Sequence, residues 1–334
     1  MTIHAHAAYT KATPLRAFTY TPQDLGPFDV EIDITHCGIC HSDVHLIDDD
    51  WGISAFPLVP GHEIIGVVRA LGPQADPALH GKRVGVGWQR ASCQRCTYCT
   101  QGRNNLCADL VTTTANHYGG FAERIRVDSR FAFPIPDAID SAAAAPLLCA
   151  GVTVYNPLRN NNIRASDRVG VIGIGGLGHL AIQFAAVLGC EVTAFTSNPA
   201  KAEQARELGA SHVVSSRDAD ALRQIDRELD FIVSTVSARL DWDAYLQTLR
   251  PGGTLCMAGA LADDISISPE VLMDRELRLT GSSIGGRVDM AEMLSVAAHH
   301  GVTAWTEVLP FDSVNEAVDR LRVNDVRYRF VLAR

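Results

Sequence analysis

The densest group of chemically active side chains runs from Cys40 to His45 and contains a thiol, two imidazoles, a hydroxyl and a carboxylate. Burial in an apolar strand would leave these polar groups without partners, which is unfavourable. A solvated loop would accept them but gives no reason for a cysteine. A metal site accounts for the mixture, because the Cys40 thiolate is a soft ligand and its neighbours can orient ligands or carry protons.

A second candidate ligand pair, His62 and Glu63, follows a Pro-Gly turn and precedes an apolar strand expected over residues 64–68. Functional side chains are often presented by loops that a rigid element positions. The chain between Cys40 and His62 is long enough for a loop to return. His62 and Glu63 are therefore a candidate ligand pair that could join the first thiolate, although a single His-Glu pair is more often incidental.

The remaining metal candidates are four cysteines in a segment with few apolar residues, spaced C-x2-C-x2-C-x7-C: Cys93, Cys96, Cys99 and Cys107. Cysteines in a cytoplasmic chain indicate metal ligands rather than disulfides. Four thiolates around Zn²⁺ would hold such a segment together. An iron–sulfur cluster is the competing interpretation, although its usual run has a tighter fourth spacing followed by proline. A nucleic-acid-binding zinc ribbon is disfavoured, because the segment carries few arginines within an acidic protein.

A glycine-rich turn begins the second half of the chain. An apolar strand expected over 169–172 leads into the pattern G-x-G-x-x-G, and an apolar helix follows until Gly189. The turn consists of Gly173, Ile174, Gly175, Gly176, Leu177 and Gly178. With a strand before it and a helix after it, the pattern predicts a dinucleotide site whose glycines let the pyrophosphate approach backbone amides.

The residues after the next strand, expected over 192–195, indicate which dinucleotide is bound. An NAD-binding site usually has a carboxylate here for the ribose hydroxyls. This chain has Thr196, Ser197 and Asn198 instead, with Lys201 one turn later. Hydroxyls and a cation favour a 2′-phosphate, so NADP is predicted over NAD. Asn198 also has a purely structural interpretation as a helix cap before Pro199.

The pattern of secondary structure positions these groups in two domains. Short strands dominate the first part, where Val30, Ile32 and Ile34 alternate with polar residues. From residue 167 strands alternate with helices, with further strands expected at 212–215, 230–235, 254–259 and 277–281, which predicts an open, mostly parallel sheet. A helix at 313–323 and a strand at 328–332 are expected to fold back onto the first domain.

Length and composition disfavour several classes of partner and cellular location. The chain has 334 residues, a length typical of two domains, and a net charge of -9, which disfavours nucleic acid and anionic membranes as partners. Residues 169–189 contain no charged side chain but six glycines, so we expect a buried strand, turn and helix rather than a membrane span. The first residues lack the layout of a signal peptide, which favours a cytoplasmic protein.

Taken together, these motifs resemble the zinc-dependent medium-chain alcohol dehydrogenases over essentially the whole chain. CGICHSDVH, PGHEIIG, the four-cysteine segment, PLLCAGVTVY and GIGGLGH are similar to the cinnamyl-alcohol-dehydrogenase branch. AFTSNPAK, LDWDAYL and RYRFVL are similar to bacterial NADPH-dependent aldehyde reductases of broad range. The resemblance implies a GroES-like β-rich catalytic domain (1–149 and 286–334), a Rossmann domain with a doubly wound parallel sheet (150–285), and a homodimer.

The resemblance also implies roles for individual residues. It places a catalytic zinc ion on Cys40, His62 and Cys149, with Glu63 as an additional or alternating ligand, and a structural zinc ion on the four clustered cysteines. Cys37 would be a packed thiol. Ser42 would pass a proton to or from the substrate and His45 would relay it to solvent, while Asp43 would orient His62.

Further residues would contact the cofactor or the substrate. The resemblance places Thr153 near the nicotinamide, and His41 and Arg329 near the pyrophosphate. Trp51, Trp88 and Ile284 would line an apolar pocket for aromatic or medium aliphatic aldehydes.

The predicted function is zinc-dependent hydride transfer between NADP(H) and an aldehyde or primary alcohol, with aldehyde reduction favoured. One alternative is an NAD(H)-dependent alcohol dehydrogenase of the same fold. A zinc hydrolase using Cys40, His62 and Glu63 is the alternative of a different class, and it would leave the glycine-rich turn without a role.

Overall fold

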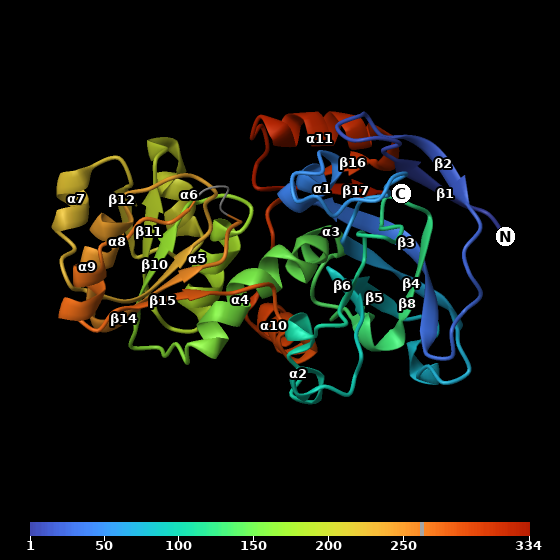
Figure 1. Cartoon of the computed structure of the whole chain (residues 1–334), viewed down its shortest axis with the longest axis horizontal. Coiled ribbons are helices and arrows are strands. Elements are labelled where there is room, and N and C mark those ends of the chain that lie inside the picture. Colours follow the sequence, from blue (N-terminus) through green and yellow to red (C-terminus); the bar gives the residue numbers. More distant parts are fainter. Residues whose placement is uncertain (261–263) are drawn as a thin grey trace. The chain divides into compact units, whose positions relative to one another are not determined.

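The structure is a computed structural model that describes residues 1–260 and 264–334, and the chain forms two compact units (Figure 1). Unit 1 comprises Met1–Cys149 and Gly286–Arg334, and unit 2 comprises Ala150–Gly285. Both chain termini lie in unit 1. No helix in the described part of the chain is long and apolar enough to cross a membrane.

Unit 1 is rich in β-structure, and its helices are short except for α10. Its strands are β1 (Ile3–Ala7), β2 (Arg16–Tyr20), β3 (Asp29–Ile39), β4 (Glu63–Leu71), β5 (Arg83–Val86), β6 (Gln89–Ala91), β7 (Val111–Thr112), β8 (Arg124–Asp128), β9 (Phe133–Pro134), β16 (Thr306–Pro310) and β17 (Arg329–Ala333). Its α-helices are α1 (His41–Ile47), α2 (Thr97–Thr100), α3 (Ser141–Ala144), α10 (Arg287–His300) and α11 (Val314–Arg322). Its 3-10 helices are η1 (Pro77–Leu79), η2 (Asn104–Leu106), η3 (Ser129–Phe131), η4 (Ala145–Leu148) and η6 (Phe311–Ser313).

A seven-stranded sheet forms the frame of unit 1. Six strands follow the order β16-β17-β3-β4-β5-β9, and β8 also pairs with β3. All of these pairs are antiparallel except β16 with β17. The C-terminal strand β17 thus lies beside β3, the strand that leads directly into Cys40.

The alternating residues of β3 explain how the sheet forms the core. Val30, Ile32 and Ile34 are buried in the main apolar cluster, as the period-2 pattern predicts. Glu31 points to the opposite side but is also buried, because Arg126 pairs with its carboxylate at 2.6 Å and Arg69 at 3.4 Å. This burial of an acidic residue follows from neighbouring strands that the alternation alone does not identify.

Unit 2 contains the alternating strands and helices expected from residue 167 onward. Its strands are β10 (Arg168–Ile172), β11 (Glu191–Thr196), β12 (His212–Ser215), β13 (Leu229–Ser234), β14 (Leu249–Met257) and β15 (Arg278–Gly281). Its helices are α4 (Ala150–Asn160), α5 (Gly178–Val187), η5 (Pro199–Lys201), α6 (Ala202–Glu207), α7 (Ala219–Arg223), α8 (Trp242–Thr248) and α9 (Pro269–Asp274).

The six strands of unit 2 form one parallel sheet in the order β12-β11-β10-β13-β14-β15. In chain order this is 3-2-1-4-5-6, the order of a doubly wound dinucleotide-binding sheet. The predicted parallel sheet is confirmed. One boundary differs: β14 begins at Leu249, not Thr254, because Leu249 already pairs with Leu229 before an irregularity in the register.

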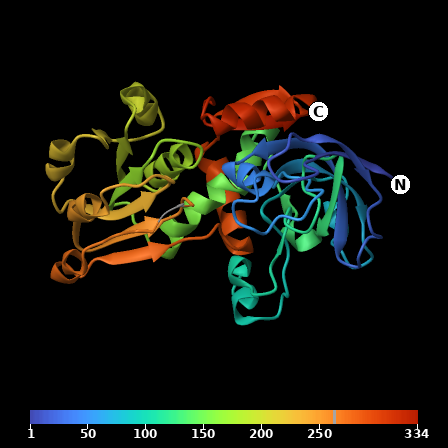
Figure 2. The ribbon, with the colours of Figure 1, turned by 45° about the horizontal axis from the view of Figure 1, so that its top comes forward.

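The four-cysteine segment, which includes α2, extends away from the sheet of unit 1 and is seen from two directions in Figures 1 and 2. It touches the start of α10: Val288 lies so close to Gly102 that an added Cβ there would meet its Cγ2 at 2.2 Å. Gly102 also has a φ of +77°, which favours glycine. The segment therefore packs against the start of α10 through Gly102, while residues such as Tyr98 and Leu106 are exposed.

Candidate active site and metal centres

The first group of functional residues is created where β3 ends and α1 begins. Cys40 is the residue before the helix, and its backbone N–H donates to Asp43 Oδ2 at 2.9 Å. A carboxylate in the first helical turn satisfies an N–H group that has no partner within the helix. The same turn presents Ser42 and His45, so the local sequence folds its polar residues around one helix start.

Asp43 also holds the loop that carries the second candidate ligand, His62. Its Oδ1 accepts hydrogen bonds from the backbone N–H of Gly61 at 2.9 Å and from His62 Nδ1 at 3.0 Å. Asp43 and His62 are both fully buried. Burial lowers the pKa of His62, but the Asp43 carboxylate and the Cys40 sulfur beside it together outweigh burial and raise that pKa well above its usual value. A carboxylate that orients a histidine through Nδ1 and leaves Nε2 free is typical of zinc sites.

The ligand atoms of Cys40, His62, Glu63 and Cys149 all lie within 4.8 Å of one another. His62 Nε2 is 3.3 Å from Cys149 Sγ. The hydrogen bond from Cys149 holds the pKa of Cys40 well below its usual range, whereas the same bond and burial raise the pKa of Cys149. A divalent cation bound here would stabilise both groups as thiolates.

Glu63 has an unexpected partner in this cluster. The Arg329 guanidinium donates to Glu63 Oε1, and the arginine side chain is almost fully buried. Burial raises the pKa of Glu63 to about 7, although the positive charge of Arg329 acts against it. Within the described residues, Glu63 Oε2 is buried without a hydrogen-bond partner. A buried carboxylate oxygen of this kind, on a residue whose ligand atom lies within 4.8 Å of those of two cysteines and a histidine, fits a metal ion.

The pairing with Glu63 changes the interpretation of Arg329. The family resemblance placed this arginine near the pyrophosphate of the cofactor, and nothing in its sequence context indicated a carboxylate partner. Its position in β17, beside β3, brings it to Glu63 across 266 residues of sequence. The pyrophosphate contact remains a prediction, and the ion pair is the contact that the structure adds.

The expected proton-carrying residues lie beside the cluster. Ser42 Oγ is 3.7 Å from Cys40 Sγ. His45 is partly exposed, and its Nδ1 contacts Asp50 Oδ2 at 2.8 Å. Asp50 is a residue that sequence reasoning missed, because three consecutive aspartates gave no reason to single one out. The histidine therefore has a fixed orientation at the solvent side of α1.

Two of the predicted pocket residues lie next to these groups. The Trp88 ring is edge-on to His62 with centroids 5.0 Å apart, and it meets Trp51 at 6.3 Å. Trp51 in turn lies 5.2 Å from the ring of His45. Ile284 belongs to unit 2. Cys37 is fully buried in the core cluster and has no place in either group of metal ligands within the described chain.

The four clustered cysteines converge as a second group. Cys93 Sγ lies 3.9 Å from Cys99 Sγ and 3.5 Å from Cys107 Sγ. Tetrahedral Zn²⁺ with sulfur at about 2.3 Å requires sulfur atoms about 3.8 Å apart. The backbone N–H groups of Arg95 and Cys96 hold the pKa of Cys93 at about 6. The sulfur distances therefore fit a tetrahedral zinc ion.

In unit 2, the glycine-rich turn connects β10 to α5. Gly173 has a φ of +89°, which favours glycine, and a Cβ on Gly178 would meet the carbonyl oxygen of Gly173 at 1.8 Å. Around Gly175, by contrast, an added Cβ would have no neighbour within 4 Å among the described residues. The turn is tight where helix and strand pack, and open where a pyrophosphate would approach the backbone. Gly176 and Leu177 complete it before α5 begins.

The residues expected to select the dinucleotide lie at the end of the neighbouring strand. Thr196 ends β11, and Asn198 caps η5 by accepting from the N–H of Ala200 at 3.0 Å, as its structural interpretation predicted. Lys201 reaches back to the glycine-rich turn, where Nζ donates to the Ile174 carbonyl at 2.7 Å. A cation thus lies directly beside the turn that the phosphates would occupy.

Comparisons with known proteins agree with this arrangement. The alcohol dehydrogenase GroES-like domain matches residues 26–137, and the zinc-binding dehydrogenase family matches residues 176–299. Aldehyde reductase AdhA of Synechocystis sp. is 40% identical over 99% of this chain and 98% of its own. NADP-dependent alcohol dehydrogenase C of Mycobacterium bovis is 41% identical over 99% and 98%. The structure of cinnamyl alcohol dehydrogenase SbCAD4 from Sorghum bicolor has a TM-score of 0.95 and 38% identity, covering 100% of this chain and 98% of that one.

The chain belongs to the zinc-dependent medium-chain alcohol dehydrogenases. This membership confirms the predicted fold class, a GroES-like unit with a Rossmann unit, and the similarity to the cinnamyl-alcohol-dehydrogenase branch. It also makes the protein an oxidoreductase, so the hydrolase alternative is not supported.

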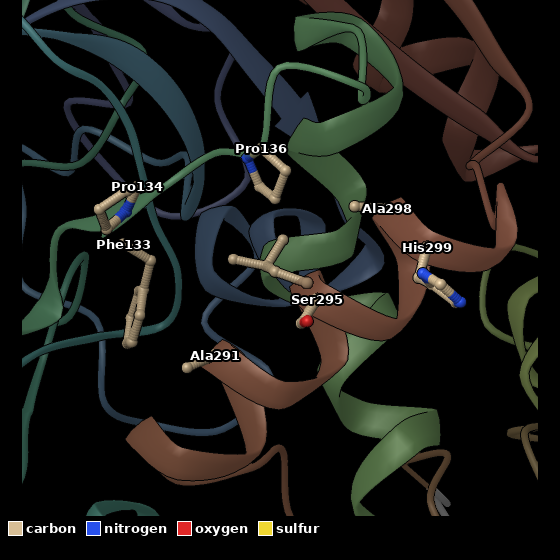
Figure 3. A pocket seen from close by; sticks show the side chains of 8 residues that line it. Phe133, Pro134, Pro136, Ala291, Ser295, Ala298 and His299 are labelled. Atoms are coloured by element: carbon tan, nitrogen blue, oxygen red, sulfur yellow. The ribbon is translucent and has the colours of Figure 1, made fainter.

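A surface hollow of about 440 Å³ lies elsewhere in unit 1 of this dehydrogenase, between β9 and α10 (Figure 3). Phe133, Pro136, Leu294 and His299 are among its lining residues. None of the predicted site residues lines it. The hollow therefore takes no part in the candidate active site.

One prediction for this dehydrogenase concerns the four-cysteine segment. Cys96→Ser should remove one zinc ion and lower the free energy of unfolding by about 3 kcal/mol, because the segment has little apolar core of its own. In a domain of this size that corresponds to a fall in Tm of roughly 6–12 °C. Calorimetry and elemental analysis would measure both, with Thr100→Ala in α2 as the control. A variant with unchanged zinc content would contradict the assignment.

Proposed function

We propose that this protein reduces aldehydes to primary alcohols with NADPH, at a zinc ion held by Cys40, His62 and Cys149. The observation that carries the proposal is the buried group of two cysteines, a histidine and a glutamate whose ligand atoms lie within 4.8 Å, with Asp43 fixing the histidine. The relatives named above include an aldehyde reductase and an NADP-dependent alcohol dehydrogenase. Glu63 would be an additional or alternating ligand.

Each of the proposed site residues would have its own role in the reaction. When bound, the zinc ion would polarise the carbonyl oxygen and the nicotinamide would supply the hydride. Ser42 would give a proton to the substrate oxygen, and His45, oriented by Asp50, would replace that proton from solvent. Trp51 and Trp88 would offer apolar surface to the substrate, and Thr153 and His41 would contact the cofactor.

The second zinc ion is also part of the proposal. The sulfur distances in the four-cysteine segment support a structural ion, so we expect two zinc ions per chain, one with four sulfur ligands and one with mixed ligands. Elemental analysis of the purified protein tests this directly. A finding of iron, or of a single zinc ion at full occupancy, would contradict it.

A cytoplasmic homodimer is proposed as the working form. All nine cysteines are free thiols, which suits a reducing compartment. Within the described residues, β15 is an edge strand of the sheet in unit 2, paired with β14 alone, and its Leu279 is exposed. A second copy could cover this edge. Light scattering of the purified protein would give the mass in solution.

The experiment that tests the function is NADPH oxidation followed across a panel of aromatic and aliphatic aldehydes. We expect turnover with several of them, and loss of turnover when the zinc is removed with a chelator. Absence of NADPH oxidation with every aldehyde, in protein that carries its zinc, would exclude the proposal.

A second prediction concerns the choice of cofactor. Thr196→Asp places a carboxylate near the proposed 2′-phosphate, so repulsion should lower kcat/KM for NADPH by roughly tenfold or more, about 1.4 kcal/mol, and shift the preference toward NADH. Thr196→Asn is the matched control, since it has a similar size and no charge. Steady-state kinetics with both cofactors measure the shift. Equal use of NADH and NADPH by the wild type would contradict the assignment of this loop.

A further inference from the structure

Asn156, in the middle of α4, uses its whole side-chain amide in buried hydrogen bonds. Only 3% of the residue is exposed. Its Nδ2 donates to Ser282 Oγ at 3.0 Å and to the backbone carbonyl of Ile284, while its Oδ1 accepts from Asn160 Nδ2. The amide therefore ties α4 to the segment that follows β15, within unit 2.

The segment held by Asn156 has a strained backbone. Ile284 has a φ of +41°, in the left-handed region. A β-branched residue rarely adopts this conformation, because its Cβ substituents crowd the backbone. Such a residue persists only where its surroundings hold it in place, and strained residues of this kind gather at binding sites. The hydrogen bond to the carbonyl of Ile284 itself is a contact that can hold it.

The position of Asn156 along α4 links this strain to the reaction. Thr153, which the proposed function places near the nicotinamide, lies one turn before Asn156 on the same helix face. Ile284 is one of the residues proposed to line the substrate pocket. Helix α4 thus carries both Thr153, a proposed cofactor contact, and Asn156, whose hydrogen bond holds Ile284, a proposed substrate contact. We call this hydrogen bond the clamp.

We propose that Asn156 is a positioning residue that holds Ile284 in its left-handed conformation and thereby sets which aldehydes the enzyme accepts. This inference rests on the proposed function. Without the clamp, Ile284 relaxes to a negative φ, and its side chain turns away from its present direction. One methylene group more or less in an apolar pocket changes the discrimination between two substrates by roughly 10–200-fold, so a reoriented Ile284 side chain should alter substrate choice.

The test compares three variants with the wild type. Asn156→Ala removes the amide, Asn156→Leu keeps its approximate volume but makes no hydrogen bond, and Asn161→Ala is the control. Asn161 directly follows the last residue of the same helix, and its Nδ2 donates to the backbone carbonyl of Pro157 at 2.8 Å. Each variant is assayed with NADPH and two aldehydes, the bulky cinnamaldehyde and the small butanal, and its zinc content and Tm are measured.

We expect both Asn156 variants to change the ratio of kcat/KM between the two aldehydes by about tenfold while zinc content stays constant. In Asn161→Ala this ratio should stay within about twofold of the wild type. Substitutions away from buried networks and strained backbone usually have effects of this size. If both aldehydes lose activity equally, Asn156 serves only the stability of the fold and the inference fails.

A double-mutant cycle isolates the proposed contact. In an Ile284→Gly background the left-handed conformation carries no strain and the pocket side chain is gone. Asn156→Ala should then leave the aldehyde ratio unchanged, because the two residues act through each other. An equal effect of Asn156→Ala in both backgrounds would overturn the inference.

A readout without substrate separates this inference from the proposed function. Amide hydrogen exchange in a peptide covering residues 282–286 should be faster in Asn156→Ala than in the wild type and in Asn161→Ala. Unchanged exchange means that Asn156 does not hold the segment, whatever the enzyme reduces. Faster exchange in a protein that oxidises no NADPH with any aldehyde would instead exclude the proposed function and leave the clamp standing.

Discussion

Cys149→Ala is expected to abolish aldehyde reduction while most of the fold remains intact. The substitution removes one of the three proposed protein ligands of the catalytic zinc, and metal polarisation of a carbonyl stabilises the transition state by several kcal/mol. A loss of about 4 kcal/mol corresponds to a fall of roughly 10³-fold in kcat/KM. Zinc content should fall from two ions per chain to one. Steady-state kinetics and elemental analysis on the same preparation would measure both.

The matched control for this prediction is Cys256→Ala. Cys256 is a buried cysteine that lies in β14 of unit 2, outside both groups of clustered cysteines. Its loss should change Tm slightly and leave zinc content and turnover close to the wild type. If Cys149→Ala kept full activity, the thiol would not be a ligand needed for catalysis and the proposed site would be wrong.

Ser42→Ala should keep both zinc ions and NADPH binding but lose most turnover. The hydroxyl lies 3.7 Å from the proposed ligand Cys40 and is the group proposed to pass a proton to the substrate oxygen. General acid–base contributions are typically about 10²–10⁴-fold, so the fall in kcat should lie in that range. Ser42→Thr retains the hydroxyl and should recover much of the activity. His45→Ala should be milder, since water can replace the histidine at the solvent end.

The competing explanation is that Ser42 merely braces the loop. Ser54 provides the comparison, because its hydroxyl donates to the carbonyl of Leu46 at 2.6 Å and therefore braces the segment after α1. Ser54→Ala should lower Tm with little change in kcat. A Ser42→Ala variant with normal kcat and bound zinc would exclude the proton path, and one that loses zinc or stability instead would show that Ser42 is a bracing residue.

Local sequence was sufficient to predict the features that depend on neighbours along the chain. The glycine-rich turn between β10 and α5 follows from strand, turn and helix periodicity over about twenty residues. The cap formed by Asn198 and the carboxylate of Asp43 at the start of α1 follow from capping rules of the same short range. The four cysteines converge because their spacing forces a compact loop around one point.

The tertiary structure decided the contacts that join distant segments. Arg329 reaches Glu63 only because β17 returns beside β3, and Asn156 reaches Ile284 only because α4 packs near the end of β15. Glu31 is buried because Arg126 lies on the neighbouring strand β8. Each of these pairs depends on strand order and register, which bring together residues about a hundred or more positions apart. No periodicity or spacing in a single sequence encodes such a pairing, since it is the packing of whole elements that selects the partner.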